Sequence, residues 1–142
     1  MGPHLMVSRV LIALGIGIGL LSWKESVDHI GSPDFLVPAY ALGATHSWYH
    51  VFREVCGDVA KMAVLLLLFF GSARWRTPAT WWIGLILMLG YYAPFWIGTP
   101  FLSALAAPNG TAEAIHVAMA LFAAAALMLA WPCFHEHQEH TL

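Results

Sequence analysis

Titratable side chains follow one stripe of an otherwise apolar stretch, residues 46–70. The stretch reads HSWYHVFREVCGDVAKMAVLLLLFF, and its polar half gives way to an unbroken apolar run. Residues four apart on a helix drift by only about 40° per step, so they share one face. The titratable side chains on this face are His46, His50, Glu54, Asp58 and Lys61. A stripe of this kind, about 22 Å long, favours acid–base chemistry, ion binding or metal ligation.

Two later segments offer further polar groups to this stripe. Glu113 and His116 form an E-x-x-H pair on one helix face. Tyr91 and Tyr92 lie late in the preceding apolar segment. Ionisable side chains within a membrane face the bundle interior or a wet cavity, so we expect these groups to meet in one polar pocket. The candidate catalytic residues are Glu54, Asp58, Lys61, Tyr91, Tyr92, Glu113 and His116, and the candidate cofactor or metal ligands are His46 and His50.

The composition is typical of a small protein that lies almost entirely in a membrane. Of its 142 residues, 60% are hydrophobic and 10% are charged, whereas charged residues make up about a quarter of a soluble domain. The net charge is −2, and no basic patch extends beyond Arg74 and Arg76, so nucleic acid is not an expected partner. Cys56 and Cys133 should lie at opposite membrane depths, too far apart for a disulfide.

Hydropathy predicts an all-α, integral membrane four-helix bundle that forms one domain over residues 1–142. The expected spans are residues 5–23, 46–71, 80–98 and 112–131, with a polar tail at 133–142. The connection 24–45 is too charged to cross, and its apolar second half is expected to lie in the interface or fold back over the bundle. Thr111 is expected to cap the last span and Pro132 to stop it.

The same pattern gives a packing contact and an orientation. Gly15 and Gly19 are four apart in the first span, a spacing of small residues that lets another helix approach closely. Arg9, Arg74 and Arg76 lie on the side shared by the two termini and the turn between the second and third spans. The positive-inside rule therefore predicts that both termini are cytoplasmic (N-in, C-in), with the polar half of the second span in the outer half of the bilayer.

Charge inside a membrane must be compensated, because each buried ionised group costs about 2.5–3.5 kcal/mol on insertion scales. We therefore expect Glu54 and Asp58 to be buried against Lys61 or Arg53. A purely structural interpretation remains open, in which these pairs only hold the bundle in register. Glu113 then only complements the positive end of its helix.

Three kinds of function use a polar pocket inside a bundle. One is a metal site built from His, Glu and Asp of facing helices, although only Glu113 and His116 supply the E-x-x-H motif of di-iron sites. Another is an ion or proton path, although the polar stripe ends at Lys61 and the apolar run after it would block conduction through the inner half of the span. The third is an enzyme that moves protons or opens a strained ring in an apolar substrate drawn from the bilayer.

The order of four spans resembles that of styrene oxide isomerase, a small bacterial membrane enzyme. The local similarities are VPAY before the second span, ATHS around His46, GYY late in the third span and APN ahead of the fourth. The resemblance implies a trimer that binds haem b and rearranges aryl epoxides to aldehydes. It also implies that His46 is the iron ligand and that Tyr91 or Tyr92 is a pocket residue. His50 is a competing ligand.

The chain departs from that family at functional positions. Phe52 stands where the family has an asparagine, and an apolar residue near Ile83 stands where it has an aspartate. The sequence thus predicts a multi-pass protein of the bacterial inner membrane, an oligomer in the lipid bilayer that isomerises a small apolar substrate. The alternative is a non-enzymatic ion- or metal-binding protein or an accessory membrane subunit.

Overall fold

The described part of the chain is helical throughout. The computed structural model describes residues 2–36, 45–93, 101, 107 and 109–135, and these contain no strand. The long helices are α1 (Pro3–Asp28), α2 (His46–Phe70), α3 (Pro78–Tyr91) and α5 (Gly110–His135), and short 3-10 turns stand at η1 (Pro33–Phe35) and η2 (Ala73–Trp75). The all-α prediction is therefore confirmed.

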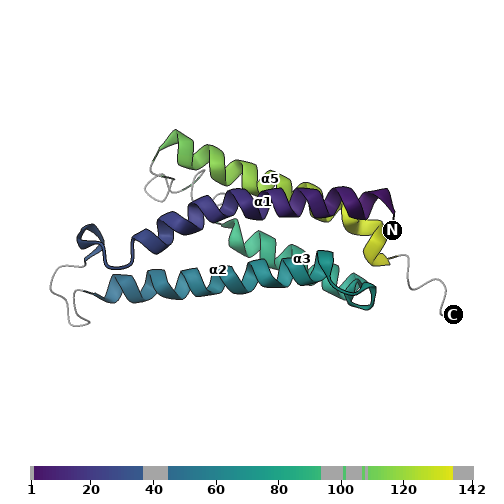
Figure 1. Ribbon diagram of the computed structural model, residues 1–142, viewed down its shortest axis with the longest axis horizontal. Coiled ribbons are helices and arrows are strands. Elements are labelled where there is room, and N and C mark those ends of the chain that lie inside the picture. Colours follow the sequence, from purple (N-terminus) through teal and green to yellow (C-terminus); the bar gives the residue numbers. More distant parts are fainter. Residues whose placement is uncertain (1, 37–44, 94–100, 102–106, 108, 136–142) are drawn as a thin grey trace.

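The four helices run antiparallel to their neighbours in a closed ring. α1 packs on α5 and α2, and α3 packs on α5 and α2 (Figure 1). The start of α1, the turn between α2 and α3 and the end of α5 lie at one end of the bundle. The other end gathers the end of α1, the start of α2 and the start of α5, where the predicted polar pocket should lie.

Two glycines bring α1 against α5, as the sequence predicted. A Cβ atom on Gly15 would lie 3.3 Å from the Cβ atom of Phe122, and one on Gly19 would lie 3.0 Å from the terminal methyl of Met119. Gly17 lies between them and would meet nothing within 4 Å. Because a larger side chain at either position would press on α5, Gly15 and Gly19 allow the two helices to pack closely.

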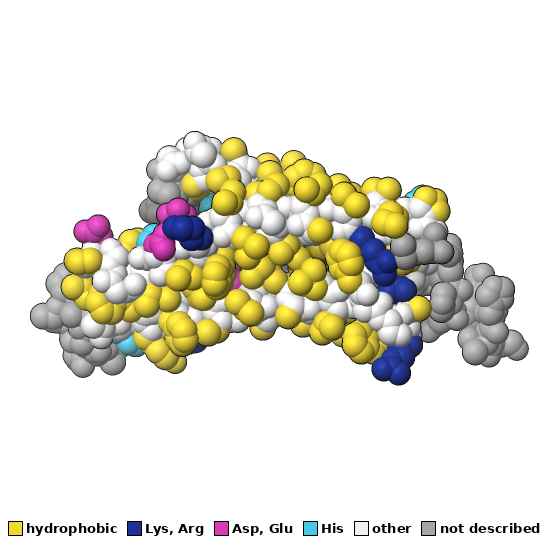
Figure 2. Space-filling view, viewed as in Figure 1, with side chains coloured by type: hydrophobic (Ala, Val, Ile, Leu, Met, Phe, Trp, Pro, Cys, Tyr) yellow, Lys and Arg dark blue, Asp and Glu magenta, His cyan; other side chains and the backbone are white. Residues whose placement is uncertain are grey.

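Alanines line much of the buried face of α5, while large apolar residues are found both in the core and on the outside of the bundle. Ala120, Ala123, Ala126 and Ala130 of α5 are all buried. Exposed large apolar side chains stand on every long helix, among them Leu14, Leu21, Phe52, Leu67, Trp82, Ile86, Leu121 and Met128. Apolar side chains cover the middle of the visible face, and charged ones gather toward its two ends (Figure 2). This distribution is the reverse of that of a water-soluble bundle.

Two helices of the described part are long and apolar enough to cross a membrane, namely α1 and α5. α2 has comparable length but carries four charged residues, and α3 has only 14 residues. The membrane association expected from composition is thus supported by two helices, and four crossings stay a prediction. The predicted boundaries of the second span, 46–71, agree with α2 to within a residue.

The first helix is longer than predicted. α1 ends at Asp28, so residues 24–28 continue the helix instead of forming a connection. Lys24 and Asp28 form an exposed ion pair one turn apart, which supports the added turn. The chain turns at Gly31, whose φ of 86° suits glycine.

The last helix passes through its proline. α5 begins at Gly110, is capped by Asn109 instead of Thr111, and continues past Pro132 to His135. A proline near a helix end removes one backbone hydrogen bond, and packing outweighs this loss here. Phe134 is buried with its ring centroid 6.0 Å from that of Phe69. The predicted end of the third span at 98 lies outside the described residues, as does the apolar segment 37–44.

Two arginines cap the carboxyl end of α2. Arg9 donates from Nε to the carbonyl of Phe69 at 2.7 Å, and Arg76 donates from a terminal nitrogen to the carbonyl of Gly71 at 3.0 Å. Cations are favourable at this negative end of a helix. Burial and the nearby charge of Arg9 lower the pKa of Arg76. The basic residues used to predict orientation therefore also stabilise one end of the bundle.

Candidate functional site

A cleft of about 620 Å³ lies toward the end of the bundle where α1 ends and α5 begins. α1, α2, α3 and α5 all contribute to its walls. Its lining residues are Leu21, Ser22, Trp23, Glu25, Ser26, His29, Glu54, Asp58, Tyr91, Asn109, Thr111, Ala112, Ile115 and His116. These described lining residues include three carboxylates, two imidazoles and a phenol, and no lysine or arginine.

Four predicted site residues meet in this cleft: Glu54, Asp58, Tyr91 and His116. They come from α2, α3 and α5, the helices from which the sequence predicted the pocket. Lys61 and Tyr92 lie deeper and line a separate inner cavity. Glu113, His46 and His50 are not among the residues that line either space.

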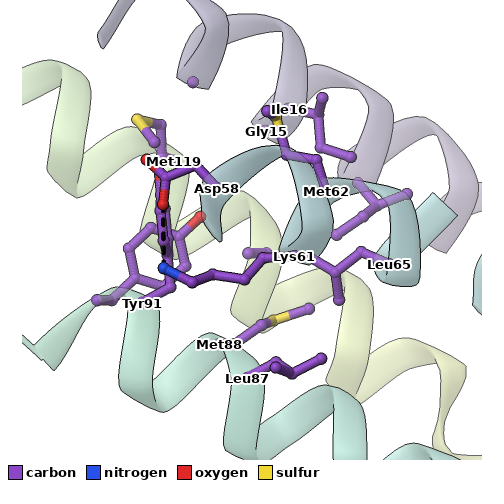
Figure 3. Close-up of a pocket in the computed structure, with 14 residues that line it drawn as sticks. Gly15, Ile16, Asp58, Lys61, Met62, Leu65, Leu87, Met88, Tyr91 and Met119 are labelled. Carbon is purple, nitrogen blue, oxygen red and sulfur yellow. Dashed lines mark hydrogen bonds and ion pairs between the residues drawn. The ribbon is translucent and has the colours of Figure 1, made fainter. Parts of the chain in front are cut away.

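The inner cavity is small and mostly apolar (Figure 3). Its volume is about 30 Å³, close to the space that one water molecule occupies in the liquid, about 30 Å³. Lys61 reaches from α2 between Tyr91 and Asp58, while Met88 and Leu87 lie below it. Asp58 and Tyr91 line both this cavity and the outer cleft, so they form the partition between them.

Asp58 is the most deeply placed charge of the described residues. It is 5% exposed, and its Oδ1 accepts a hydrogen bond from Nζ of Lys61 at 3.0 Å. Lys61 in turn lies 4.8 Å from the ring centroid of Tyr91. The predicted burial of Asp58 against Lys61 is confirmed. The ion pair compensates a charge that would otherwise be costly at this depth.

Glu54 departs from the expectation of burial. It is exposed and faces the cleft, one turn nearer the start of α2 than Asp58. Arg53 is also exposed and lies 5.9 Å from the ring centroid of Tyr49. A carboxylate at the mouth of a cleft keeps part of its hydration, so it needs no buried partner. Glu54 is therefore placed to meet a ligand.

Two hydrogen bonds tie α1 to its neighbours at the level of the cleft. Ser22 Oγ and His116 Nε2 lie 3.0 Å apart, joining α1 to α5. The indole nitrogen of Trp23 donates to the carbonyl of Val55 at 3.3 Å, joining α1 to α2. These bonds fix the separation of three of the cleft walls.

α1 contributes side chains to the cleft that the sequence did not predict. Ser22, Glu25, Ser26 and His29 line it, although the sequence places them at the end of a span and in a connection. Their spacing of three, four and seven residues is that of one helix face. This polar periodicity, continuing past Trp23, is the signal that would have identified them.

His46 and His50 pair with each other on the first turns of α2. Their Nε2 atoms lie 2.8 Å apart; His50 is exposed and His46 is partly buried. One Nε2 atom must donate and the other accept, so neither ring can bind iron through Nε2 without breaking this bond. His50 thus bonds His46 instead of Glu54. The pair as arranged does not fit the haem implied by the resemblance.

No metal cluster is evident elsewhere in the described residues either. Among them, no group of three or more His, Cys, Asp or Glu side chains is placed to hold a metal ion. Neither Cys56 nor Cys133 forms a disulfide: Cys56 is exposed on α2, and Cys133 is partly buried on α5.

Comparisons of the chain with protein-family models, curated proteins and solved structures find no match. The residues of the cleft and their geometry are therefore the basis for assigning a function.

Proposed function

We propose that this chain is a multi-pass membrane enzyme that isomerises a small apolar substrate in the outer cleft. The apolar outer faces of the helices support a position in the bilayer, as does the placement of Arg9, Arg74 and Arg76 at one end. With that end in the cytoplasm, the cleft faces the outer leaflet. An apolar molecule would then reach it from the bilayer.

The observation that carries this proposal is the set of acid–base groups in the cleft. Glu54 and Asp58 offer carboxylates, His116 offers an imidazole, and Tyr91 offers a hydroxyl, all on the walls of one cleft. Leu21, Ile115 and Ala112 complete the lining with apolar surface. A site that is apolar with a few convergent polar groups suits a small organic molecule.

An epoxide is a substrate whose isomerisation such a site would favour. Tyr91 or His116 donates a hydrogen bond to the ring oxygen as one carbon–oxygen bond breaks, and the carboxylate of Glu54 stabilises the positive charge that develops on carbon. A hydrogen then moves with its electron pair to that carbon, and a carbonyl forms. All atoms of the substrate remain in the product, so no co-reactant is needed.

The assembly and location complete the proposal. We propose an oligomer of identical subunits in a bacterial inner membrane, a trimer by the resemblance. Such an assembly would bury part of the exposed apolar surface on α2 and α3. Haem b would not take part in the reaction in the cleft, because His46 and His50 do not line it.

The test is turnover of an aryl epoxide by the purified protein in lipid vesicles, with the carbonyl product measured by gas chromatography. Tyr91→Phe and Glu54→Gln should each lower kcat by about 100-fold, the size of a general acid–base contribution. Tyr49→Phe and Asp34→Asn are matched controls, because both residues are exposed outside the cleft. No turnover by the wild type over a panel of epoxides would refute the isomerase proposal.

The negative lining of the cleft favours a second candidate, cation binding without catalysis. Glu25, Glu54 and Asp58 face the cleft, and no lysine or arginine is among the lining residues that the structure describes. Titration calorimetry with Ca²⁺, Mn²⁺ and an organic ammonium ion would detect such binding. Binding that Glu54→Gln abolishes, in a protein without epoxide turnover, would favour this candidate.

A further inference from the structure

We propose that Ser22 and His116 form a nucleophile–base pair that gives the cleft a second activity, acyl transfer from small uncharged carboxylic esters. Ser22 Oγ lies 3.0 Å from His116 Nε2, within the range of a hydrogen bond between nucleophile and base. Both residues line the cleft, so a substrate can reach the hydroxyl. They come from helices that are distant in sequence and adjacent in space.

The glycine contact between α1 and α5 lies next to this pair. Ser22 follows Gly19 by three residues on α1, and His116 precedes Met119 by three residues on α5. The Met119 methyl lies 3.0 Å from the position of a Cβ atom on Gly19. Because Gly19 and Met119 meet one turn below the pair, α1 and α5 pack against each other close to Ser22 and His116.

A second serine in the same cleft lacks this arrangement. Ser26 lines the cleft one turn after Ser22, but its hydroxyl donates to the backbone carbonyl of Ser22 at 3.4 Å. A serine hydroxyl is a weak nucleophile unless a base takes its proton. The chain therefore supplies its own internal control: two serines in one cleft, of which only Ser22 contacts an imidazole.

The charges around the pair bear on which esters the cleft would accept. Glu113 stands one turn before His116 on α5. Among the described residues, carboxylates line the cleft and no lysine or arginine does, so anionic substrates are disfavoured. Tyr91 and Asn109 also line the cleft and carry N–H or O–H groups suited to a developing oxyanion.

In the proposed step, Ser22 Oγ attacks the ester carbonyl carbon while His116 Nε2 takes the hydroxyl proton. The carbon–oxygen bond to the alcohol then breaks, and the alcohol leaves with the proton from His116. Water attacks the acyl-serine in the same way, releasing the carboxylic acid and restoring the hydroxyl. Water is the only co-reactant.

The test is labelling of the protein in detergent micelles with a fluorophosphonate, which phosphonylates an activated serine with loss of fluoride. We expect peptide mass spectrometry to find the label on Ser22. Ser26→Ala should retain labelling at the wild-type rate, Ser22→Ala should abolish it, and His116→Ala should slow it about 100-fold.

An unlabelled wild-type protein would refute the proposal, as would a label that Ser26→Ala removes. Labelling of the His116→Ala variant at the wild-type rate would also refute it. The wild-type result does not depend on whether a variant folds. Epoxide turnover is a separate measurement that is tested through Glu54 and Tyr91, so failure of either activity is distinguishable from failure of the other.

Discussion

Lys61 lies with its ammonium 4.8 Å from the centroid of the Tyr91 ring, joining α2 to α3 at the floor of the cleft. The same ammonium donates to Asp58 at 3.0 Å. One lysine thus compensates a buried carboxylate and holds an aromatic residue of the proposed site. A cation over an aromatic face contributes about 0.5–2 kcal/mol, depending on desolvation.

Removing only one member of the ion pair should destabilise the protein more than removing both. Lys61→Met leaves the carboxylate of Asp58 buried without its cation, a loss of about 3 kcal/mol. The double variant Lys61→Met with Asp58→Leu removes the desolvation cost as well, so it should be less destabilised. Unfolding by SDS in mixed micelles measures both changes.

An exposed pair provides the control for this comparison. Lys24 and Asp28 are 67% and 52% exposed in their side chains, so Lys24→Met should cost less than about 1 kcal/mol. Equal losses for Lys61→Met and the double variant would contradict the pairing.

The glycine contact between α1 and α5 should be sensitive to side-chain volume. Gly15→Leu would place atoms against Phe122 and force the helices apart, at a cost of about 1–3 kcal/mol. Gly17→Leu is the matched change, because a Cβ atom there meets nothing within 4 Å. Thermal unfolding in detergent should give a lower Tm for Gly15→Leu alone. A similar Tm for the two variants would exclude close packing at Gly15.

Both termini should be cytoplasmic. In a background with Cys56 and Cys133 replaced by serine, we expect a membrane-impermeant maleimide added to intact cells to label Asp34→Cys. It should miss Ser72→Cys, which is exposed in the turn between α2 and α3. Permeabilised cells, in which both positions should react, serve as the control. Labelling of Ser72→Cys but not of Asp34→Cys in intact cells would show that the topology is the opposite of the predicted one.

The purified protein should show no Soret band. His46 and His50 engage each other through their Nε2 atoms, the atoms best placed to bind iron. Addition of haem b should produce no saturable spectral change. A Soret band in the wild type that disappears in either His46→Ala or His50→Ala would overturn this expectation and establish that histidine as an iron ligand.

Much of the arrangement could be predicted from sequence because apolar runs and glycine spacing act locally. The bounds of α2 follow from its composition, and the contact at Gly15 follows from its spacing with Gly19. The convergence of Glu54, Asp58, Tyr91 and His116 follows from the order of the predicted spans and from which ends carry polar residues.

Other features depend on tertiary contacts that no local pattern reveals. α5 passes Pro132 because Phe134 packs on Phe69, a contact between residues far apart in sequence. Glu54 is exposed and Asp58 is buried, although both are carboxylates on the same face of α2. The difference depends on how deeply each residue lies in the cleft, which their positions in the sequence do not indicate. The contact between Ser22 and His116 likewise depends on the packing of α5 against α1.

The alanine-rich inner face of α5 also determines which solvents would unfold the protein. Burial of alanine against its neighbours removes little area from water, and in lipid the surroundings are as apolar as the core. Close contact between backbones, not avoidance of water, then holds the helices together. Urea, which weakens the hydrophobic effect, should leave the bundle intact in micelles, whereas a detergent that competes for helix–helix contacts should separate it.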